Sequence, residues 1–264
     1  RLSIITSKAQ TTRHRIMGIL SGDDFQIIYS DTPGIIKPEY ELHETMMRFV
    51  TSSFEDSDLI LFVTDLYEKY EGEKVIDYLK EVNVPVILVM NKIDLAKGSQ
   101  AEDKVDYWKE IMNFHDTVMV SALENTGIEG VFEKIIEHLP EHPAYFPKDT
   151  LTDKPERFFV DEMIREKIFK QYKKEIPYSC EVVTTSFKED ENIIRISADI
   201  YVERDSQKGI VIGHKGESLK KVGTAAREDL EVFFGKKIFL ETHVKVEKDW
   251  RKKEAKLKRF GYLN

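Results

Sequence analysis

Three short apolar runs constrain the fold more than any other feature of this 264-residue chain. They are residues 59–64 (LILFVT), 86–90 (VILVM) and 117–120 (TVMV). Such runs, without polar alternation, are typical of parallel strands that are covered on both faces. Stretches with helical periodicity lie between and beside them, at about 40–54, 71–82, 101–113 and 127–138. We therefore expect an α/β domain with a doubly wound sheet and with ligand chemistry at the carboxyl ends of its strands.

A polar motif follows the second run, at residues 91–94 (NKID). The carboxylate of Asp94 can accept two hydrogen bonds from the N1 and N2 groups of guanine, a donor pair that adenine lacks. We expect Asn91 to touch the base edge and to connect neighbouring loops, and Lys92 to lay its aliphatic stem along the base. The alternative is a solvated loop after a buried strand.

A second motif, Ser121-Ala122-Leu123, follows the third run. Its backbone N–H groups are predicted to bind the guanine carbonyl oxygen. Both motifs leave strands of one predicted sheet at the same edge, because the strands are parallel. Together they predict a guanine-nucleotide site.

Residues 31–34 (DTPG) follow a predicted hairpin whose strands flank residues 21–24. Asp31 is a candidate Mg²⁺ ligand through water, and the backbone N–H of Gly34 can approach a terminal phosphate closely. Upstream, Thr12 offers a second hydroxyl ligand for Mg²⁺. The alternatives are a Pro-Gly turn and an ordinary polar loop. Ile35 cannot orient an attacking water, so no catalytic residue is assigned.

The chain changes character after four prolines between residues 139 and 155. We expect a GTP-binding domain at 1–140, a linker at 141–155 and an RNA-binding domain at 156–264, although a surface loop inside one domain is the alternative to a linker. From 156 onward the pattern predicts helices at 156–174, 217–234 and 249–260 and strands at 178–187, 193–203 and 237–247.

The glycine-flanked motif Gly213-His214-Lys215-Gly216 opens the second of these helices. Two glycines let the backbone approach a sugar-phosphate chain, and Lys215, Lys220 and Lys221 add positive charge. A tight turn before a helix is the alternative.

The last predicted helix is rich in lysine and arginine and includes Lys252 and Lys253. Such a segment can grip RNA phosphates, and its interleaved aromatic residues can stack on bases. The alternative is a solvated face with its aromatic residues in the core, and Trp250 is better suited to the core.

Charge is divided unevenly along the chain. Residues 151–264 hold 25 basic and 21 acidic residues, whereas residues 1–150 hold 15 basic and 27 acidic ones. A polyanion is therefore expected to meet the second half. Cys180 is the single cysteine, so an intrachain disulfide is excluded and a buried thiol in a reducing compartment is expected.

In this order, the GTP-site motifs, the proline-bearing linker and the VIGHKG stretch at 211–216 resemble the Era GTPase family. Residues 7–15 look like its switch region. The resemblance implies a P-loop GTPase-like doubly wound sheet, followed by an α+β type II KH domain and a basic C-terminal helix. It implies GTP or GDP with Mg²⁺ as cofactors, and binding to the 3′ end of small-subunit ribosomal RNA during assembly of the small ribosomal subunit. It also implies a cytoplasmic monomer with peripheral membrane contact.

One expected element of the family is missing from the sequence. No G-x-x-x-x-G-K-[ST] phosphate loop occurs in these 264 residues, so we expect an incomplete sheet and a longer natural protein. The alternative function is that of a nucleotide-independent RNA-binding module.

Overall fold

The computed structural model describes residues 2–6, 8 and 10–263, which form two compact units. The first unit contains residues 1–20, 28–49 and 150–264, and the second contains residues 21–27 and 50–149. These units are defined by contacts, so the functional division at 140 and 156 stays a prediction. None of the described helices is long and apolar enough to cross a bilayer.

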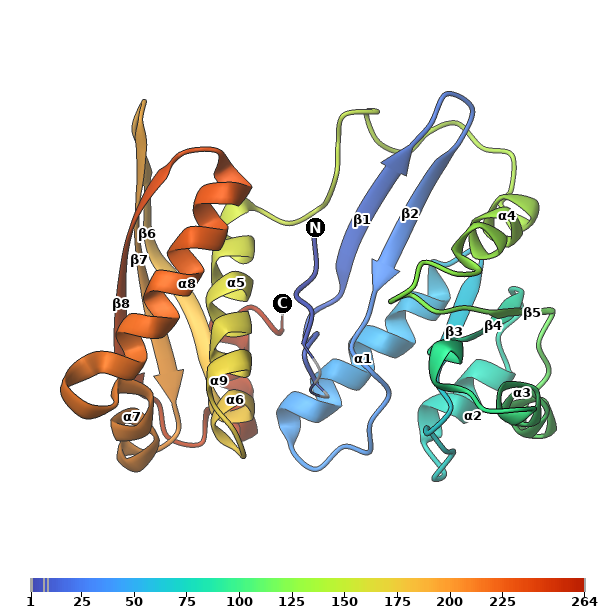
Figure 1. The fold of residues 1–264 in the computed structure, drawn as a ribbon, viewed down its shortest axis with the longest axis horizontal. Coiled ribbons are helices and arrows are strands. Elements are labelled where there is room, and N and C mark those ends of the chain that lie inside the picture. Colours follow the sequence, from blue (N-terminus) through green and yellow to red (C-terminus); the bar gives the residue numbers. More distant parts are fainter. Residues whose placement is uncertain (1, 7, 9, 264) are drawn as a thin grey trace. The chain divides into compact units, whose positions relative to one another are not determined.

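The second unit is built on a parallel sheet in the order β3-β4-β5 (Figure 1). Its strands are β3 (Ile60–Thr64), β4 (Val86–Met90) and β5 (Asp116–Met119), each within a residue or two of the predicted bounds. All five residues of β4 are buried, because this strand lies in the middle of the sheet and is covered on both faces. The apolar runs thus predicted the right strands for the right reason.

Helices cover both faces of this sheet, as the doubly wound prediction requires. They are α2 (Lys74–Lys80), α3 (Gln100–Ile111) and α4 (Ile128–His138), with a short 3₁₀ turn at Ile93–Leu95. On one face Val131 of α4 packs against Ile87 and Val89. On the other face the ring of Trp108 in α3 meets Phe62 at 4.9 Å.

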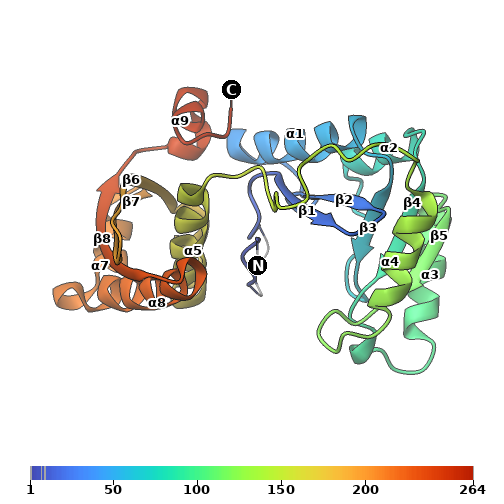
Figure 2. The same ribbon diagram turned by 90° about the horizontal axis from the view of Figure 1, so that it is seen from above.

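The first unit contains the mixed sheet β6-β7-β8. Strands β6 (Glu181–Glu189) and β7 (Ile193–Val202) are antiparallel, and β8 (Lys237–Val246) lies parallel to β7. The long helices α5 (Glu156–Gln171) and α8 (Glu217–Phe234) pack together over one face of this sheet (Figure 2). Their apolar faces and the inner face of the sheet form one core that includes Cys180, which is fully buried as predicted.

Short helices complete this unit and correct two sequence-based predictions. Helix α6 is Ile176–Ser179 and α7 is Asp205–Ile212; the latter was not predicted, because its β-branched residues resemble a strand. The single helix predicted at 249–260 is wrong in extent. It is a 3₁₀ turn at Trp250–Lys252 followed by α9 (Glu254–Arg259), because Asp249 is left-handed at φ 53° and Lys253 is extended.

The first strands along the described chain form a hairpin. Strands β1 (Ile16–Ser21) and β2 (Gln26–Asp31) form a two-stranded sheet, and α1 (Glu41–Glu55) follows. The predicted hairpin and helix are both confirmed. Ser7 and Ala9 of the predicted switch region lie outside the described residues.

Candidate functional site

The carboxyl ends of β3, β4 and β5 form one edge in the second unit. The Asn91 N–H donates to the Thr64 carbonyl (2.8 Å), and the Val120 N–H donates to the Met90 carbonyl (2.8 Å). These bonds extend the sheet past the strand ends. The loops that begin at Asn91 and Ser121 therefore start side by side.

Asn91 connects these two loops. Its Oδ1 accepts hydrogen bonds from the Lys92 N–H (2.7 Å) and from the Ala122 N–H (3.0 Å). Lys92 adopts the left-handed region, with φ 62°, which turns the chain sharply after the strand. The predicted contact of Asn91 with a base stays a prediction.

Asp94 is held in place by Ser121. The Ser121 hydroxyl, which is 1% exposed, donates to Oδ1 of Asp94 (2.5 Å) and accepts from the Glu124 N–H (3.2 Å). Asp94 itself is exposed. A carboxylate offers about four acceptor positions, so one bond to Ser121 leaves room for two donors from a ligand. This arrangement can receive the paired N–H groups of guanine.

The loop after Ser121 is closed on itself. Ser121 and Thr126 exchange two backbone hydrogen bonds (3.0 Å each), and Gly127 follows at φ 74°. A Cβ on Gly127 would lie 2.3 Å from the Met119 carbonyl oxygen, so this position requires glycine. Ala122 is exposed and Leu123 is 83% exposed, and both stand at the surface beside Asp94.

Asp65 is a residue of this edge that the sequence analysis missed. Its Oδ2 pairs with Lys92 Nζ (2.5 Å), and its Oδ1 accepts from the N–H groups of Tyr67 (2.8 Å) and Glu68 (3.1 Å). Burial alone would raise the pKa of the Asp65 carboxyl, but these bonds outweigh it and the pKa is lowered. The available signal was its place directly after the LILFVT run.

The predicted phosphate-side residues belong to the first unit. Asp31 is exposed at the end of β2 and accepts a hydrogen bond from the Ser3 hydroxyl (2.7 Å). The Thr12 hydroxyl is half-buried and has no hydrogen-bond partner among the described residues. Gly34 is exposed, and a Cβ there would meet nothing within 4 Å.

These side chains suit Mg²⁺ in their chemistry. Within the described part of the chain, no three His, Cys, Asp or Glu residues gather into a metal site. Mg²⁺ prefers hard oxygen ligands, and in nucleotide enzymes it takes one or two from the protein and the rest from phosphates and water. The Asp31 carboxylate and the unpaired Thr12 hydroxyl are such ligands.

The glycine-flanked loop of the first unit has a backbone that depends on its glycines. Gly213 lies at φ 72° and ψ −179°, Lys215 at φ 48° and Gly216 at φ 82°. A Cβ on Gly213 would lie 2.3 Å from Ser218 Oγ, whereas one on Gly216 would meet nothing within 4 Å. Gly213 is therefore required for both its backbone conformation and the lack of space, whereas Gly216 is required only for its backbone conformation.

The cations around this loop are open to solvent. His214, Lys215, Lys220 and Lys221 are exposed, and the three lysines carry no ion pair among the residues that the structure describes. The loop also stands at the N-terminus of α8, where backbone N–H groups favour anions. The local geometry can therefore bind a phosphate chain.

The basic tail divides into two kinds of cation. Arg251 pairs with Glu203, and Lys256 and Arg259 pair with Glu247, so these three stabilise the fold. The predicted RNA-binding residues Lys252 and Lys253 are exposed and carry no ion pair within the described chain.

The aromatic residues of the tail are in the core, which corrects the idea that they stack on bases. Trp250 is fully buried, and Phe260 and Tyr262 are 9% and 2% exposed. The indole N–H of Trp250 donates to the Ser179 carbonyl (3.0 Å). The exposed lysines Lys252 and Lys253 are thus the remaining candidates in this tail for RNA contact.

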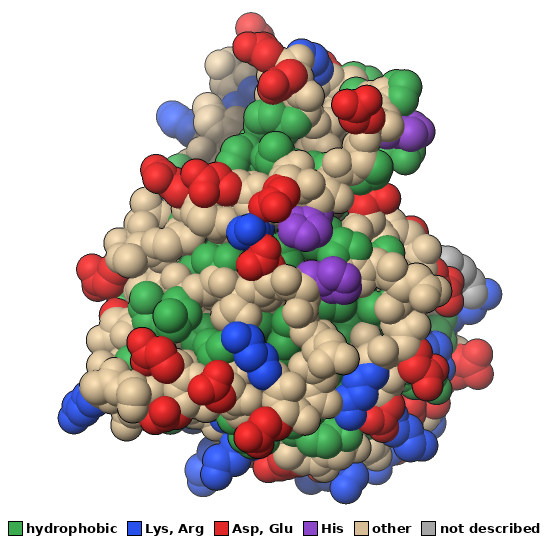
Figure 3. All heavy atoms as spheres, turned by 90° about the vertical axis from the view of Figure 1, so that its right-hand side faces the viewer, with side chains coloured by type: hydrophobic (Ala, Val, Ile, Leu, Met, Phe, Trp, Pro, Cys, Tyr) green, Lys and Arg blue, Asp and Glu red, His purple; other side chains and the backbone are tan. Residues whose placement is uncertain are grey.

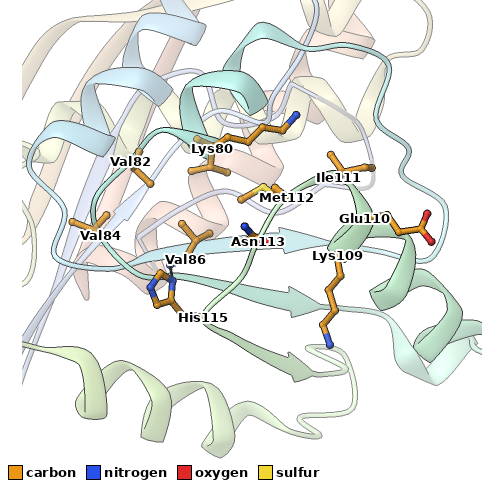
Figure 4. A pocket seen from close by; sticks show the side chains of 11 residues that line it. Lys80, Val82, Val84, Val86, Lys109, Glu110, Ile111, Met112, Asn113 and His115 are labelled. Atoms are coloured by element: carbon orange, nitrogen blue, oxygen red, sulfur yellow. Dashed lines mark hydrogen bonds between the residues drawn. The ribbon is translucent and has the colours of Figure 1, made fainter.

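The second unit also has a pocket of about 340 Å³ that is separate from Asp94 (Figure 4). It lies at the amino end of β4, where Val82, Val84, Val86 and Met112 line it. The ring of His115 stands at its edge and accepts the Val86 N–H at Nδ1 (3.2 Å). Since ligands of such sheets bind at the carboxyl ends of strands, we do not assign the nucleotide to this pocket.

The face of the second unit seen in Figure 3 shows acidic and basic side chains interspersed with apolar surface. On this face the described residues form no continuous basic area, which agrees with the acidic composition of this part of the sequence. A polyanion is better matched by the exposed lysines of the first unit.

Comparison with known proteins finds relatives of both parts of the chain. A family model described as a 50S ribosome-binding GTPase matches residues 1–92, and one described as a KH domain matches residues 175–251. The GTPase Era of Syntrophus aciditrophicus is 47% identical over 266 residues, which cover 99% of this chain and 87% of that protein.

Two solved structures are similar over the whole chain. One is a variant of Aquifex aeolicus Era bound to GDP and AlF₄⁻, with a TM-score of 0.94, 35% identity and coverage of 100% of this chain and 91% of that chain. The other is Era in complex with MgGDPNP and nucleotides 1506–1542 of 16S ribosomal RNA, with a TM-score of 0.92 and the same identity and coverage.

Proposed function

Because the chain belongs to the Era GTPase family, we propose that it is a GTPase that binds the 3′ end of small-subunit ribosomal RNA. Its role is to assist assembly of the small ribosomal subunit, and its nucleotide state controls its grip on RNA. The cofactors are GTP or GDP with Mg²⁺, as in the related structures.

One observation carries the nucleotide part of this proposal. The buried Ser121 hydroxyl fixes the Asp94 carboxylate, while the open side of that carboxylate faces solvent. A fixed carboxylate that must receive two donors rejects adenine, because it would be left unpaired on binding. Lys92, oriented by Asp65, places a cation beside the same edge.

The phosphate side rests on Thr12 and Asp31. These residues would hold Mg²⁺, and the ion supplies neutralisation of the charge on the terminal phosphates. Gly34 offers a backbone N–H without a side chain in the way. No side chain is assigned to orient the attacking water.

The RNA part rests on the loop at 213–216 and on exposed lysines without acidic partners among the described residues. A related protein has been solved with small-subunit RNA, which supports this assignment. The comparisons do not favour the alternative of a nucleotide-independent RNA-binding module, because the related structures contain nucleotide. A cytoplasmic monomer with peripheral membrane contact remains part of the proposal.

The test compares Asp94→Asn with Asp103→Asn in the complete protein. Both aspartates accept a serine hydroxyl, since Ser99 donates to Asp103 (3.0 Å), but Asp103 belongs to the first turn of α3 and not to the motif at 91–94. Asp94→Asn should lose affinity for GDP and gain it for xanthosine diphosphate, whose C2 carbonyl accepts from the new amide. Asp103→Asn should bind GDP like the unchanged protein.

RNA binding is measured in parallel with a synthetic 3′-end small-subunit sequence and with a scrambled sequence, each with GDP or a non-hydrolysable GTP analogue. The proposal expects preference for the 3′-end RNA and an affinity that depends on the nucleotide. Preference for ATP over GTP, or equal binding of both RNAs in every nucleotide state, would refute it.

A further inference from the structure

Arg13 of the predicted switch region is buried in a polar cup of the first unit. Its side chain is 2% exposed, and Nη1 donates to the Cys180 carbonyl (2.8 Å) and to Glu181 Oε2 (3.0 Å). Its Nη2 donates to the carbonyls of Pro177 (3.2 Å) and Tyr178 (3.0 Å). The end of α6 and the start of β6 thus bind one guanidinium through four acceptors.

Aromatic rings complete the cup. The guanidinium carbon of Arg13 lies 5.9 Å from the ring centre of Phe169 and 5.8 Å from that of Trp250. The Tyr262 hydroxyl donates to Glu181 Oε2 (2.5 Å), the same oxygen that Arg13 meets. A lysine cannot reproduce this planar, forked contact.

The residues on both sides of Thr12 are anchored to the same body. The Thr11 carbonyl accepts from Arg165 Nη2 (2.5 Å), and the His14 ring stacks on Tyr262 at 4.2 Å. Thr12 lies between these anchors, and its hydroxyl has no partner among the described residues. The contacts of Arg13, which together form its seat, therefore help to fix the position of the Thr12 side chain.

A second set of hydrogen bonds leads from the same N-terminal segment toward the loop at 213–216. Lys8 Nζ donates to the carbonyls of Phe169 and Tyr172 at the end of α5. The Tyr172 hydroxyl, which is buried, donates to the Val211 carbonyl (2.6 Å) in the last turn of α7. Gly213 ends that helix and begins the glycine-flanked loop.

All four acceptors of the seat depend on one side chain. Withdrawal of Arg13 would strip Glu181 and three backbone carbonyls of a donor together, so partial withdrawal gains nothing. Near this segment, Arg165 Nη1 is buried without a hydrogen-bond partner in the described chain.

We propose that Arg13 and Tyr172 are the two ends of a coupling element that links Thr12 to the loop at 213–216. The inference rests on the proposed function and assigns residues to its nucleotide control. Nucleotide with Mg²⁺ favours one position of Thr12, Arg13 transmits this to α5 and α6, and Tyr172 transmits it to the end of α7. Both are positioning residues, since their side chains donate hydrogen bonds to groups of the protein itself.

The test is the ratio of RNA dissociation constants with GDP and with a non-hydrolysable GTP analogue, measured on the complete protein. Tyr172→Phe removes only the hydroxyl. Tyr201→Phe is the matched control. Tyr201 lies opposite Glu181 across the sheet and also has a hydrogen-bonded hydroxyl, but that hydroxyl bonds to Asp199 (3.2 Å) and Arg259 (3.2 Å) and to neither end of the coupling element. Arg13→Lys keeps the charge and loses the forked contact.

We expect a ratio of about fivefold or more in the unchanged protein and in Tyr201→Phe. In Tyr172→Phe and Arg13→Lys the ratio should fall to within about twofold of unity, while each ligand still binds. If Arg13→Lys does not fold, Tyr172→Phe decides, together with amide exchange at 209–216, which nucleotide should no longer alter.

The outcomes distinguish a failure of the coupling element from a failure of the proposed function. A ratio of unity in the unchanged protein would show that nucleotide does not control RNA binding, and the proposed function would fail. A full ratio in Tyr172→Phe, beside a full ratio in the unchanged protein, would overturn the coupling element alone.

Discussion

Gly213 and Gly216 should respond very differently to the same substitution. Gly213 combines φ 72° with ψ −179°, a region that only glycine occupies readily, and its new Cβ would lie 2.6 Å from Ser218 Cβ and 3.1 Å from its backbone nitrogen. Strain of about 1–3 kcal/mol and overpacking of about 1–3 kcal/mol predict a loss of roughly 2–5 kcal/mol for Gly213→Ala. Gly216→Ala meets open space and pays only for a left-handed backbone, about 1 kcal/mol.

Urea unfolding of the two variants, followed by circular dichroism, measures this difference. Gly216→Asn is a further control, because asparagine tolerates the left-handed region and should cost less than alanine. The double variant Gly213→Ala with Ser218→Gly should recover about 1–3 kcal/mol by removing the clash. Equal losses for Gly213→Ala and Gly216→Ala, within about 0.5 kcal/mol, would refute the reasoning.

Three further predictions follow. Burial raises the pKa of Asp161 from 3.8 to about 8. Its stabilising contribution is therefore complete below the unfolded pKa and is lost as pH rises toward the folded value. Asp161→Asn should thus gain about 5 kcal/mol in unfolding free energy between pH 4 and pH 8 relative to the unchanged protein. Reversing Lys252 and Lys253 to glutamate should weaken RNA binding and lower its salt slope by about 1–2 without changing urea stability, whereas unchanged RNA affinity would assign the tail to another partner. Ser121→Ala should weaken GDP binding about tenfold by releasing Asp94, as calorimetry can measure, and equal affinity would contradict that role.

Local pattern was enough for most of the fold. The apolar runs predicted β4 to the residue and β3 and β5 closely, because a strand buried on both faces must be apolar throughout. The helix after the glycine loop was also predicted to the residue, and glycines stand at both of its ends. For these elements the local sequence is sufficient to predict the secondary structure.

Local patterns could not predict features that depend on contacts between residues far apart in the sequence. Helix α7 was missed because its β-branched residues favour strands, while a capping interaction of Gln207 with the backbone N–H groups of Glu203 and Arg204 decides for helix. The tail aromatics belong to the core because partners far along the chain cover them. Asp65 and Arg13 gain their roles from partners that no local window contains.

The use of an arginine at the seat is itself informative about function. A buried ion pair contributes little net stability compared with an apolar residue of similar size, because desolvation offsets the attraction. It does impose one geometry, since every polar group left behind by its removal is costly. An apolar side chain at position 13 would leave the segment free to slide, whereas four directed hydrogen bonds fix it in one position. The proposed coupling element needs one defined geometry more than it needs stability. Glu181 serves that need, because it binds both Arg13 and the buried Tyr262.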